Sequence, residues 1–187
     1  MDLIEELKGY KPFNEQEEKD KAEMLRRLLS GEELYYRDND SAHLTASAWV
    51  VSPDQKRVLL CYHNIYNSWS WLGGHADGER DLLKVALKEV QEESSLRHVR
   101  PLSDKIFSLE ILTVDGHEKK GKYVSSHLHL NVTYLLEGDP QDALHNKADE
   151  NKAVRWFSSE EAESVPTEVW MRERIYKKLN ARLKEYE

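Results

Sequence analysis

The pattern of apolar and polar positions predicts a series of strands from residue 43 onward. Residues 44–51 are rich in small and β-branched side chains, and residues 57–63 are mostly apolar. Both patterns are typical of strands, and the turn-forming residues 53–56 between them predict a β-hairpin. A polar, glycine-containing stretch at 115–126 predicts a loop or hairpin tip. Further strands are expected at residues 105–114, 127–136 and 153–157.

One long helix interrupts these strands. We expect Gly73 and Gly74 to form a glycine-rich loop, and the segment after it has apolar residues at helical spacing. This spacing predicts that one side of the helix is buried. The apolar residues that define this side are Leu82, Leu83, Ala86, Leu87 and Val90.

Helical patterns also occur at both ends of the chain. Asn14 and Glu17 form a capping-box pattern, so a helix is expected from there to about Ser30, with Gly31 ending it. Its predicted apolar stripe consists of Ala22, Leu25, Leu28 and Leu29. Residues 168–185 predict a closing helix, with Ile175, Leu179 and Leu183 in phase. We therefore expect a helical extension at 1–40 and one domain at 41–187.

Composition narrows the class of protein. The chain has 187 residues, 39% hydrophobic and 33% charged, which suits one globular domain with an appendage. Its net charge of −8 argues against general affinity for a nucleic acid polymer. Cys61 is the single cysteine, which excludes an intrachain disulfide, and the acidic first residues predict no signal peptide. We expect no membrane span and a cytoplasmic location.

Three glutamates near the end of the long helix carry the candidate chemistry. Glu89, Glu92 and Glu93 lie at i, i+3 and i+4, so their side chains share one helix face. They repel one another and lie at the negative end of the helix dipole. A divalent cation bound between them relieves both effects, and oxygen ligands suit Mg²⁺ or Mn²⁺. The alternative is an ordinary solvated acidic face.

The stretch from residue 73 to 96 resembles the Nudix box, G-x5-E-x7-R-E-U-x-E-E-x-G-U, where U is apolar. The matching positions are Gly74, Glu89, Val90, Glu92, Glu93 and Leu96. Three positions depart from the pattern: Arg80 replaces a glutamate, Lys88 replaces the arginine, and Ser95 replaces the second glycine. Glu79 is adjacent to Arg80 and supplies the missing carboxylate if the register shifts by one residue.

This resemblance implies an α+β fold of the Nudix type, an α/β/α sandwich with a mixed sheet. It implies a Mg²⁺-dependent hydrolase that cleaves a diphosphate bond in a nucleoside-diphosphate-linked substrate. Glu89, Glu92 and Glu93 are the implied metal ligands, and Glu89 and Glu92 the implied catalytic residues. Gly73, Gly74 and His75 are expected to contact the ligand. The expected partner is a small nucleotide, and the extension is expected to pack on the domain or to bridge a homodimer.

Two alternatives remain at this stage. The departures at Arg80 and Ser95 leave open a binding module of the Nudix fold that senses a nucleotide without turnover. Isopentenyl-diphosphate isomerase has a similar fold, but its chemistry needs a thiol in the glycine loop, whereas Cys61 lies on a predicted strand.

Other residues are weaker candidates. His127 and His129 alternate on one predicted strand face, where they either reach a ligand or metal or form a plain strand pair. Glu150 precedes the strand at 153–157 and is a candidate for an additional carboxylate. Trp69, Trp71 and Tyr66 either stack on a base or are simply buried.

Overall fold

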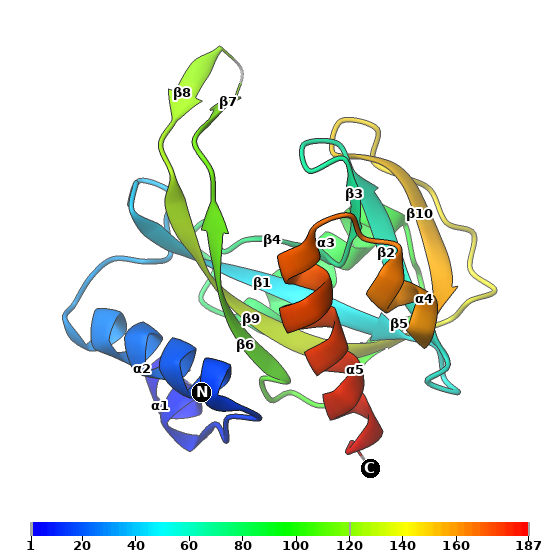
Figure 1. The fold of residues 1–187 in the computed structure, drawn as a ribbon, viewed down its shortest axis with the longest axis horizontal. Coiled ribbons are helices and arrows are strands. Elements are labelled where there is room, and N and C mark those ends of the chain that lie inside the picture. Colours follow the sequence, from blue (N-terminus) through cyan, green and yellow to red (C-terminus); the bar gives the residue numbers. More distant parts are fainter. Residues whose placement is uncertain (1, 120, 187) are drawn as a thin grey trace.

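The computed structural model describes residues 2–119 and 121–186. Within them the chain forms one sheet of eight strands, a separate two-stranded ribbon, and helices on both sides of the sheet (Figure 1). In chain order the elements are α1 (Leu3–Gly9), α2 (Glu15–Leu29), β1 (Ala42–Val51), β2 (Arg57–His63), β3 (Ser68–Ser70), β4 (Leu72–His75), α3 (Leu82–Ser94), β5 (Val99–Pro101), β6 (Ser108–Val114), β7 (His117–Lys119), β8 (Lys122–Val124), β9 (His127–Gly138), β10 (Asn151–Ser158), α4 (Ser159–Ser164), the π-helix η1 (Met171–Tyr176) and α5 (Lys177–Lys184).

The sheet is mixed, as predicted. Its main strand order is β10-β2-β1-β9-β5, and β1 pairs with β9 in parallel over its whole length. The other pairings are antiparallel. The predicted hairpin forms, but its two strands are paired only beside the turn, at Val51 and Val58. Beyond that point they diverge, and β4 pairs with β1 while β3 pairs with β2.

The expectation of a glycine loop at residues 73–75 was wrong. Gly73, Gly74 and His75 belong to β4, where they pair with Ser47, Ala46 and Thr45 of β1. The physical reason is the divergence of β2, which leaves one edge of β1 without a partner. A neighbouring edge with unpaired backbone groups stabilises a strand even where two glycines lower its intrinsic preference.

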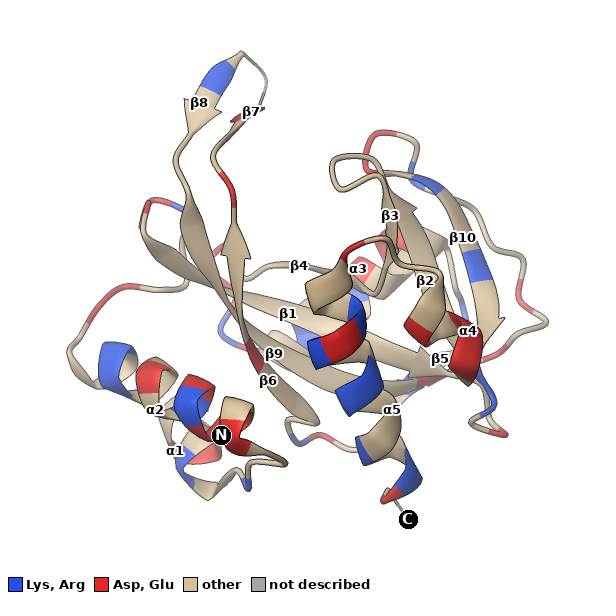
Figure 2. Ribbon diagram, viewed as in Figure 1, with Lys and Arg blue, Asp and Glu red and all other residues tan. Residues whose placement is uncertain are grey.

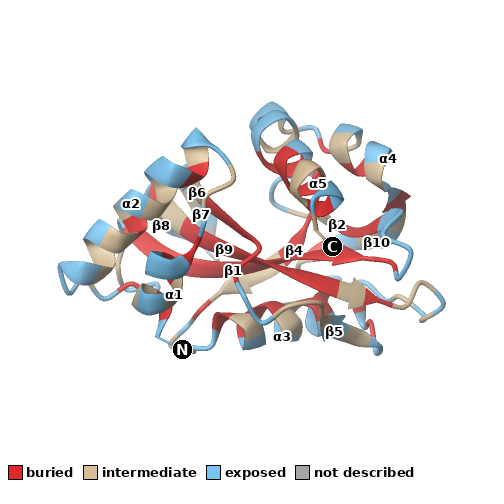
Figure 3. Ribbon diagram, turned by 90° about the horizontal axis from the view of Figure 1, so that it is seen from below, coloured by how far each residue is buried: buried red, intermediate tan, exposed pale blue. Residues whose placement is uncertain are grey.

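Helices cover the two faces of the sheet and create two hydrophobic cores (Figure 3). Leu44, Ala46, Ala48 and Val50 of β1 belong to the core that includes α3, and Trp49 of β1 belongs to the core that includes α5. This alternation is the period-two pattern expected of a strand between two layers. It confirms the predicted α+β sandwich.

The two N-terminal helices pack on the same core as α3. Leu3, Leu7 and Met24 are almost completely buried there. The predicted stripe of α2 was partly wrong, because Leu29 is 62% exposed. Asn14 caps the helix by accepting from the Glu17 N–H at 3.0 Å, as expected. The Glu17 carboxylate, however, is buried and forms other contacts described below.

The charged residues are distributed in keeping with these layers. Figure 2 shows acidic and basic residues together on α2 and basic residues on α5, whereas β1 has no Lys, Arg, Asp or Glu. The predicted closing helix begins near residue 169 and passes through the π-helix η1 before α5. Ile175, Leu179 and Leu183 are buried, as predicted. Among the described residues, no helix combines the length and apolarity needed to cross a membrane.

Candidate active site

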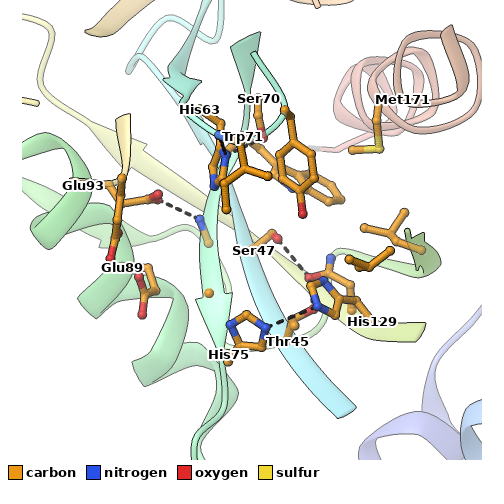
Figure 4. Close-up of a pocket in the computed structure, with 18 of the residues that line it drawn as sticks. Thr45, Ser47, His63, Ser70, Trp71, His75, Glu89, Glu93, His129 and Met171 are labelled. Atoms are coloured by element: carbon orange, nitrogen blue, oxygen red, sulfur yellow. Dashed lines mark hydrogen bonds between the residues drawn. The ribbon is translucent and has the colours of Figure 1, made fainter. Parts of the chain in front are cut away.

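A cavity of about 550 Å³ opens between α3, β4 and the start of the C-terminal helix (Figure 4). Its lining combines polar groups from β1 and β9 with acidic groups from α3 and the loop before β10. The residues used below are Thr45, Ser47, Gly73, Gly74, His75, Glu89, Glu93, His129, Asn131, Glu150 and Met171.

The floor of the cavity is formed by the face of β1 that points away from α3. Thr45 and Ser47 donate hydrogen bonds to Oδ1 of Asn131 at 2.8 and 2.9 Å. Further along the same face Trp49 is buried under α5. One face of one strand therefore changes from polar cavity floor to hydrophobic core. This change explains why small hydroxyl residues occur in a strand that is buried throughout.

Glu93 and Glu89 border the cavity from α3. Glu93 is only 3% exposed and accepts a hydrogen bond from the Gly73 N–H at 3.0 Å. Burial raises its pKa to about 8, and the charges of Glu89 and Glu150 act in the same direction. The pKa of Glu89 is also raised, first by burial and then by the charges of Glu92 and Glu150. Burial is thus the main cause of both pKa shifts, and repulsion between neighbouring carboxylates adds to it, as expected from the helical spacing.

The two glycines of β4 allow the acids to approach this strand. A Cβ atom at Gly74 would lie 2.5 Å from Cδ of Glu89. A Cβ at Gly73 would lie 2.6 Å from the carbonyl oxygen of Ala46. Glycine is therefore required at Gly73, where the obstacle is backbone, and at Gly74 it leaves the Glu89 side chain room to lie against the strand.

Glu92 differs from the other two glutamates. Among the described residues it is not part of the cavity lining, and its side chain is 41% exposed. It lies 3.6 Å from Nζ of Lys88 and 3.5 Å from Nζ of Lys147. The acidic trio is thus divided into two residues that face the cavity and one at its rim.

Lys147 is a residue that the sequence analysis missed. Its ammonium group lies 2.8 Å from Glu150 and 3.5 Å from Glu92, so it partly neutralises the acidic group. Its pKa is raised chiefly by the hydrogen bond to Glu150. Glu150, a weaker candidate from sequence, lines the cavity together with Glu89 and Glu93. The signal available in the sequence was the i, i+3 spacing of Lys147 and Glu150 in a loop next to a strand.

Histidines form the opposite side of the cavity. His75 points toward His129, with 3.3 Å between their Nε2 atoms (Figure 4). The predicted common face of His127 and His129 is confirmed, because their Nε2 atoms are also 3.3 Å apart. Burial and the neighbouring histidines lower the pKa of His129 to about 2, so this ring is neutral.

Comparison with known proteins identifies the family. The model of the NUDIX domain matches residues 41–179, which is most of the chain. The chain belongs to the Nudix family. The predicted family, and with it the assignment to Nudix-type hydrolases, is confirmed by this match. No curated protein gives a significant match to the chain.

Solved Nudix structures share the fold. An Ap4A hydrolase from C. elegans in a binary complex has a TM-score of 0.56 and 20% identity, covering 76% of this chain and 98% of its own. A NUDIX-family hydrolase from Clostridium perfringens has a TM-score of 0.52 and 20% identity, covering 78% and 98%. The dihydroneopterin triphosphate pyrophosphohydrolase of E. coli has a TM-score of 0.50 and 16% identity, covering 78% and 97%.

The departures from the Nudix box have visible structural consequences. Arg80 is exposed, stacks 4.6 Å from the ring centre of Tyr35 and lies 3.8 Å from Glu33. Glu79 does not replace the missing carboxylate at the cavity, since it pairs with Lys84 at 2.6 Å. Ser95 ends α3 with φ of 59° and ψ of 18°, the left-handed conformation in which the box has glycine.

The remaining donors fit a divalent cation of the kind that the Nudix family uses. Glu89, Glu93 and Glu150 are carboxylates in one cavity, and burial raises the pKa of the first two, so that their ionised forms are incompletely stabilised there. Oxygen donors of this type suit Mg²⁺ and Mn²⁺. Cys61 does not fit the isomerase alternative, because it is fully buried, its pKa is raised by burial, and its Sγ contacts the Trp71 carbonyl oxygen at 3.7 Å.

Proposed function

We propose that this chain is a Mg²⁺-dependent hydrolase that cleaves a diphosphate bond in a nucleoside-diphosphate-linked substrate. The observation that supports this most directly is the pair Glu89 and Glu93, held against Gly74 and Gly73 at a cavity edge with raised pKa values. A helix selected only for stability would not keep two such carboxylates together in a partly buried place.

Each acid has a distinct proposed role. Glu89 and Glu93 hold the metal, because both line the cavity. Glu92, at the rim, is proposed as a further ligand or as the residue that polarises the attacking water, with Glu89 as the second catalytic residue. When bound, the metal neutralises phosphate oxygens and activates water for in-line attack at phosphorus. Mn²⁺ is the proposed substitute for Mg²⁺.

The backbone of β4 is proposed to contact the substrate. Gly73 and Gly74 have no side chains and line the cavity between the acids and the polar floor. A phosphate group can therefore approach their backbone closely. The contact between His75 and substrate predicted from the sequence stays a prediction, since the structure directs its ring toward His129.

The substrate class rests on two kinds of support. The family acts on nucleoside diphosphate derivatives, and two proteins of similar fold are named for Ap4A and for dihydroneopterin triphosphate. We propose a small nucleotide rather than a nucleic acid polymer, in agreement with the net charge of −8. A cytoplasmic location, on the basis of the single cysteine, and a homodimer remain predictions.

The test is hydrolysis of a panel of nucleoside diphosphate derivatives with Mg²⁺ or Mn²⁺, for the wild type and for Glu89→Gln and Glu93→Gln. Because both substitutions remove a carboxylate from the cavity, we expect turnover to fall by about 100-fold or more. The matched control is Glu79→Gln, which removes a box-adjacent carboxylate that pairs with Lys84 outside the cavity. It is expected to leave turnover unchanged.

Two results would contradict this proposal. One is full activity of both cavity variants. The other is calorimetric binding of a nucleotide with no product under either metal, which would instead establish the binding-module alternative.

A further inference from the structure

The topology of the sheet places four histidines on one face. His43 of β1 and His129 of β9 are register partners in the parallel pair. His127 lies two residues before His129 and therefore points to the same side. His75 pairs with Thr45, two residues after His43, and so also faces this side. Three adjacent strands thus direct four imidazoles into one region, the wall of a second cavity of about 410 Å³ beside the acidic one.

Two nitrogen–nitrogen distances within this group match those of ligands around one ion. One ligand atom from each of His43, His75 and His129 lies within 4.8 Å of the others. The Nε2 atom of His129 is 3.3 Å from Nε2 of His75 and 3.3 Å from Nε2 of His127. In a tetrahedral zinc site with Zn–N bonds of about 2.0–2.1 Å, two ligand nitrogens are separated by about 3.3–3.4 Å.

The hydrogen bonds of the outer ring nitrogens fix the orientation of two rings. Nδ1 of His43 is 3.2 Å from the carbonyl oxygen of Asn39, and Nδ1 of His127 is 2.8 Å from that of Ser125. A carbonyl oxygen only accepts, so both Nδ1 atoms carry the proton and both Nε2 atoms present a lone pair. A backbone carbonyl on the outer nitrogen is the usual support for a metal-binding histidine.

At least one of these converging lone pairs has no hydrogen-bond donor. His43 is only 4% exposed, and among the described residues its Nε2 atom has no hydrogen-bond partner. Buried acceptors without a donor are costly, and a cation at their centre removes that cost.

We propose that His43, His75 and His129 bind a Zn²⁺ ion, with a water molecule as the fourth ligand and His127 beside the site. Zn²⁺ is chosen over Mg²⁺ because all protein donors are imidazole nitrogens, which suit zinc and other transition ions, whereas Mg²⁺ takes oxygen ligands. The site does not include the acidic group, since neither Glu89 nor Glu93 surrounds the second cavity, although His75 and His129 line both cavities. It would connect β4, β1 and β9 beside the substrate cavity and would engage His75 as a ligand.

The experiment uses the full chain without a polyhistidine tag, stripped of metal and titrated with Zn²⁺ in the presence of excess Mg²⁺. We expect one equivalent of Zn²⁺ to bind. Co²⁺ in place of Zn²⁺ should give the intense visible absorption of a tetrahedral nitrogen-ligated ion. His43→Asn and His129→Asn should each weaken binding by about 100-fold or more, since removal of a ligand costs at least as much as removal of its support.

Two control variants separate this site from other metal-binding groups. His145→Asn alters an exposed histidine of the loop before β10 and should leave Zn²⁺ binding unchanged. The double variant Glu89→Gln/Glu93→Gln should also keep one equivalent of Zn²⁺. The proposal is overturned if wild-type protein binds no stoichiometric Zn²⁺, or if the acidic variant loses the ion. The Zn²⁺ stoichiometry and the Co²⁺ spectrum of the wild type need no variant, so the absence of either still overturns the proposal even if a histidine substitution prevents folding.

Discussion

Gly73 and Gly74 are adjacent in β4, but an added methyl group would meet a different obstacle at each position. At Gly73 the obstacle is backbone: the new Cβ would lie 2.6 Å from the Ala46 carbonyl oxygen and 2.8 Å from Cα of Ser47. At Gly74 it is the carboxyl end of the Glu89 side chain, at 2.5 Å. The Glu89 side chain can move away from an added methyl group, whereas the paired backbone of β1 cannot. Substitution of Gly74 should therefore affect activity, and substitution of Gly73 should affect stability.

We predict that Gly74→Ala lowers turnover by about 100-fold while changing stability little, because it displaces Glu89. Gly73→Ala is expected to lower the free energy of unfolding by about 1–3 kcal/mol, because the strand pair must separate. Gly9→Ala serves as the control, since a Cβ there meets nothing within 4 Å. Chemical denaturation and steady-state rates measure both effects. Equal stability losses for the two β4 variants would contradict the distinction.

The raised pKa of Glu93 predicts how the stability of the metal-free protein depends on pH. Its pKa is raised from 4.5 to about 8 by burial, so between these values the folded state holds a proton that the unfolded state has released. Stability must therefore fall as pH rises through this window, by at most about 1.4 kcal/mol per pH unit from this one group.

Glu93→Gln should flatten this decline, because the amide does not titrate. The measurement is the free energy of unfolding from pH 5 to pH 8 for both proteins without divalent metal. Parallel curves would show that the Glu93 carboxylate ionises normally. Saturating Mn²⁺ should also reduce the decline in the wild type, since a bound cation favours the ionised carboxylate.

At the scale of elements, α3 ends under strain that the sequence already indicates. Ser95 has φ of 59°, a conformation that glycine adopts without steric cost. We predict that Ser95→Gly raises the free energy of unfolding by about 1 kcal/mol. Gln91→Gly, on the exposed face of the same helix, should lower it by about 1 kcal/mol. If both substitutions destabilise the protein, the cap is not strained.

Elements with a strong periodic pattern could be predicted, whereas those that depend on neighbours could not. The apolar spacing of residues 82–90 was enough to place α3, and the apolar run at 57–63 matched β2. In β4, two glycines concealed a strand that exists because β2 leaves the edge of β1 free. The π-helix η1 has no sequence signature, yet it belongs to the segment that places Met171 at the cavity.

The residues of the candidate site also divide into those that a local pattern predicts and those that depend on distant segments of the chain. Glu89 and Glu93 could be found because helical spacing brings them together locally. Lys147 and the group of four histidines depend on the pairing of β1 with β4 and β9, and on the position of a loop more than 50 residues from the box. Long-range contacts of this kind are not encoded in any local pattern. The alternation of His127 and His129 indicated two members of the histidine group, but not the other two.

At the scale of the whole molecule, a buried ionic network joins the two ends of the chain. Nζ of Lys178, on α5, lies 3.0 Å from Glu17 of α2 and 2.9 Å from Glu110 of β6. Tyr10 donates a hydrogen bond to Glu17 at 2.6 Å, and Arg182 lies 3.2 Å from the same carboxylate. Although burial opposes ionisation of Glu17, Lys178 and the hydrogen bonds bring its pKa below the usual value. This network fixes the N-terminal helices to the domain.

We predict that Lys178→Met lowers the free energy of unfolding by about 3–5 kcal/mol, because it leaves Glu17 and Glu110 as buried carboxylates without their cation. Lys177→Met is the matched control: this neighbouring lysine is 49% exposed and pairs with Glu173, so its substitution should cost less than about 1 kcal/mol.

The same network predicts a dependence on pH. Because the pKa of Glu17 is lowered, the stabilisation that Lys178 provides should persist at neutral pH and disappear as pH falls through that pKa. Denaturation at pH 7 and at a series of pH values below 4.5, together with proteolysis of α1 and α2, tests both statements. Equal effects of the two lysine substitutions would mean that the extension is held by its apolar contacts alone.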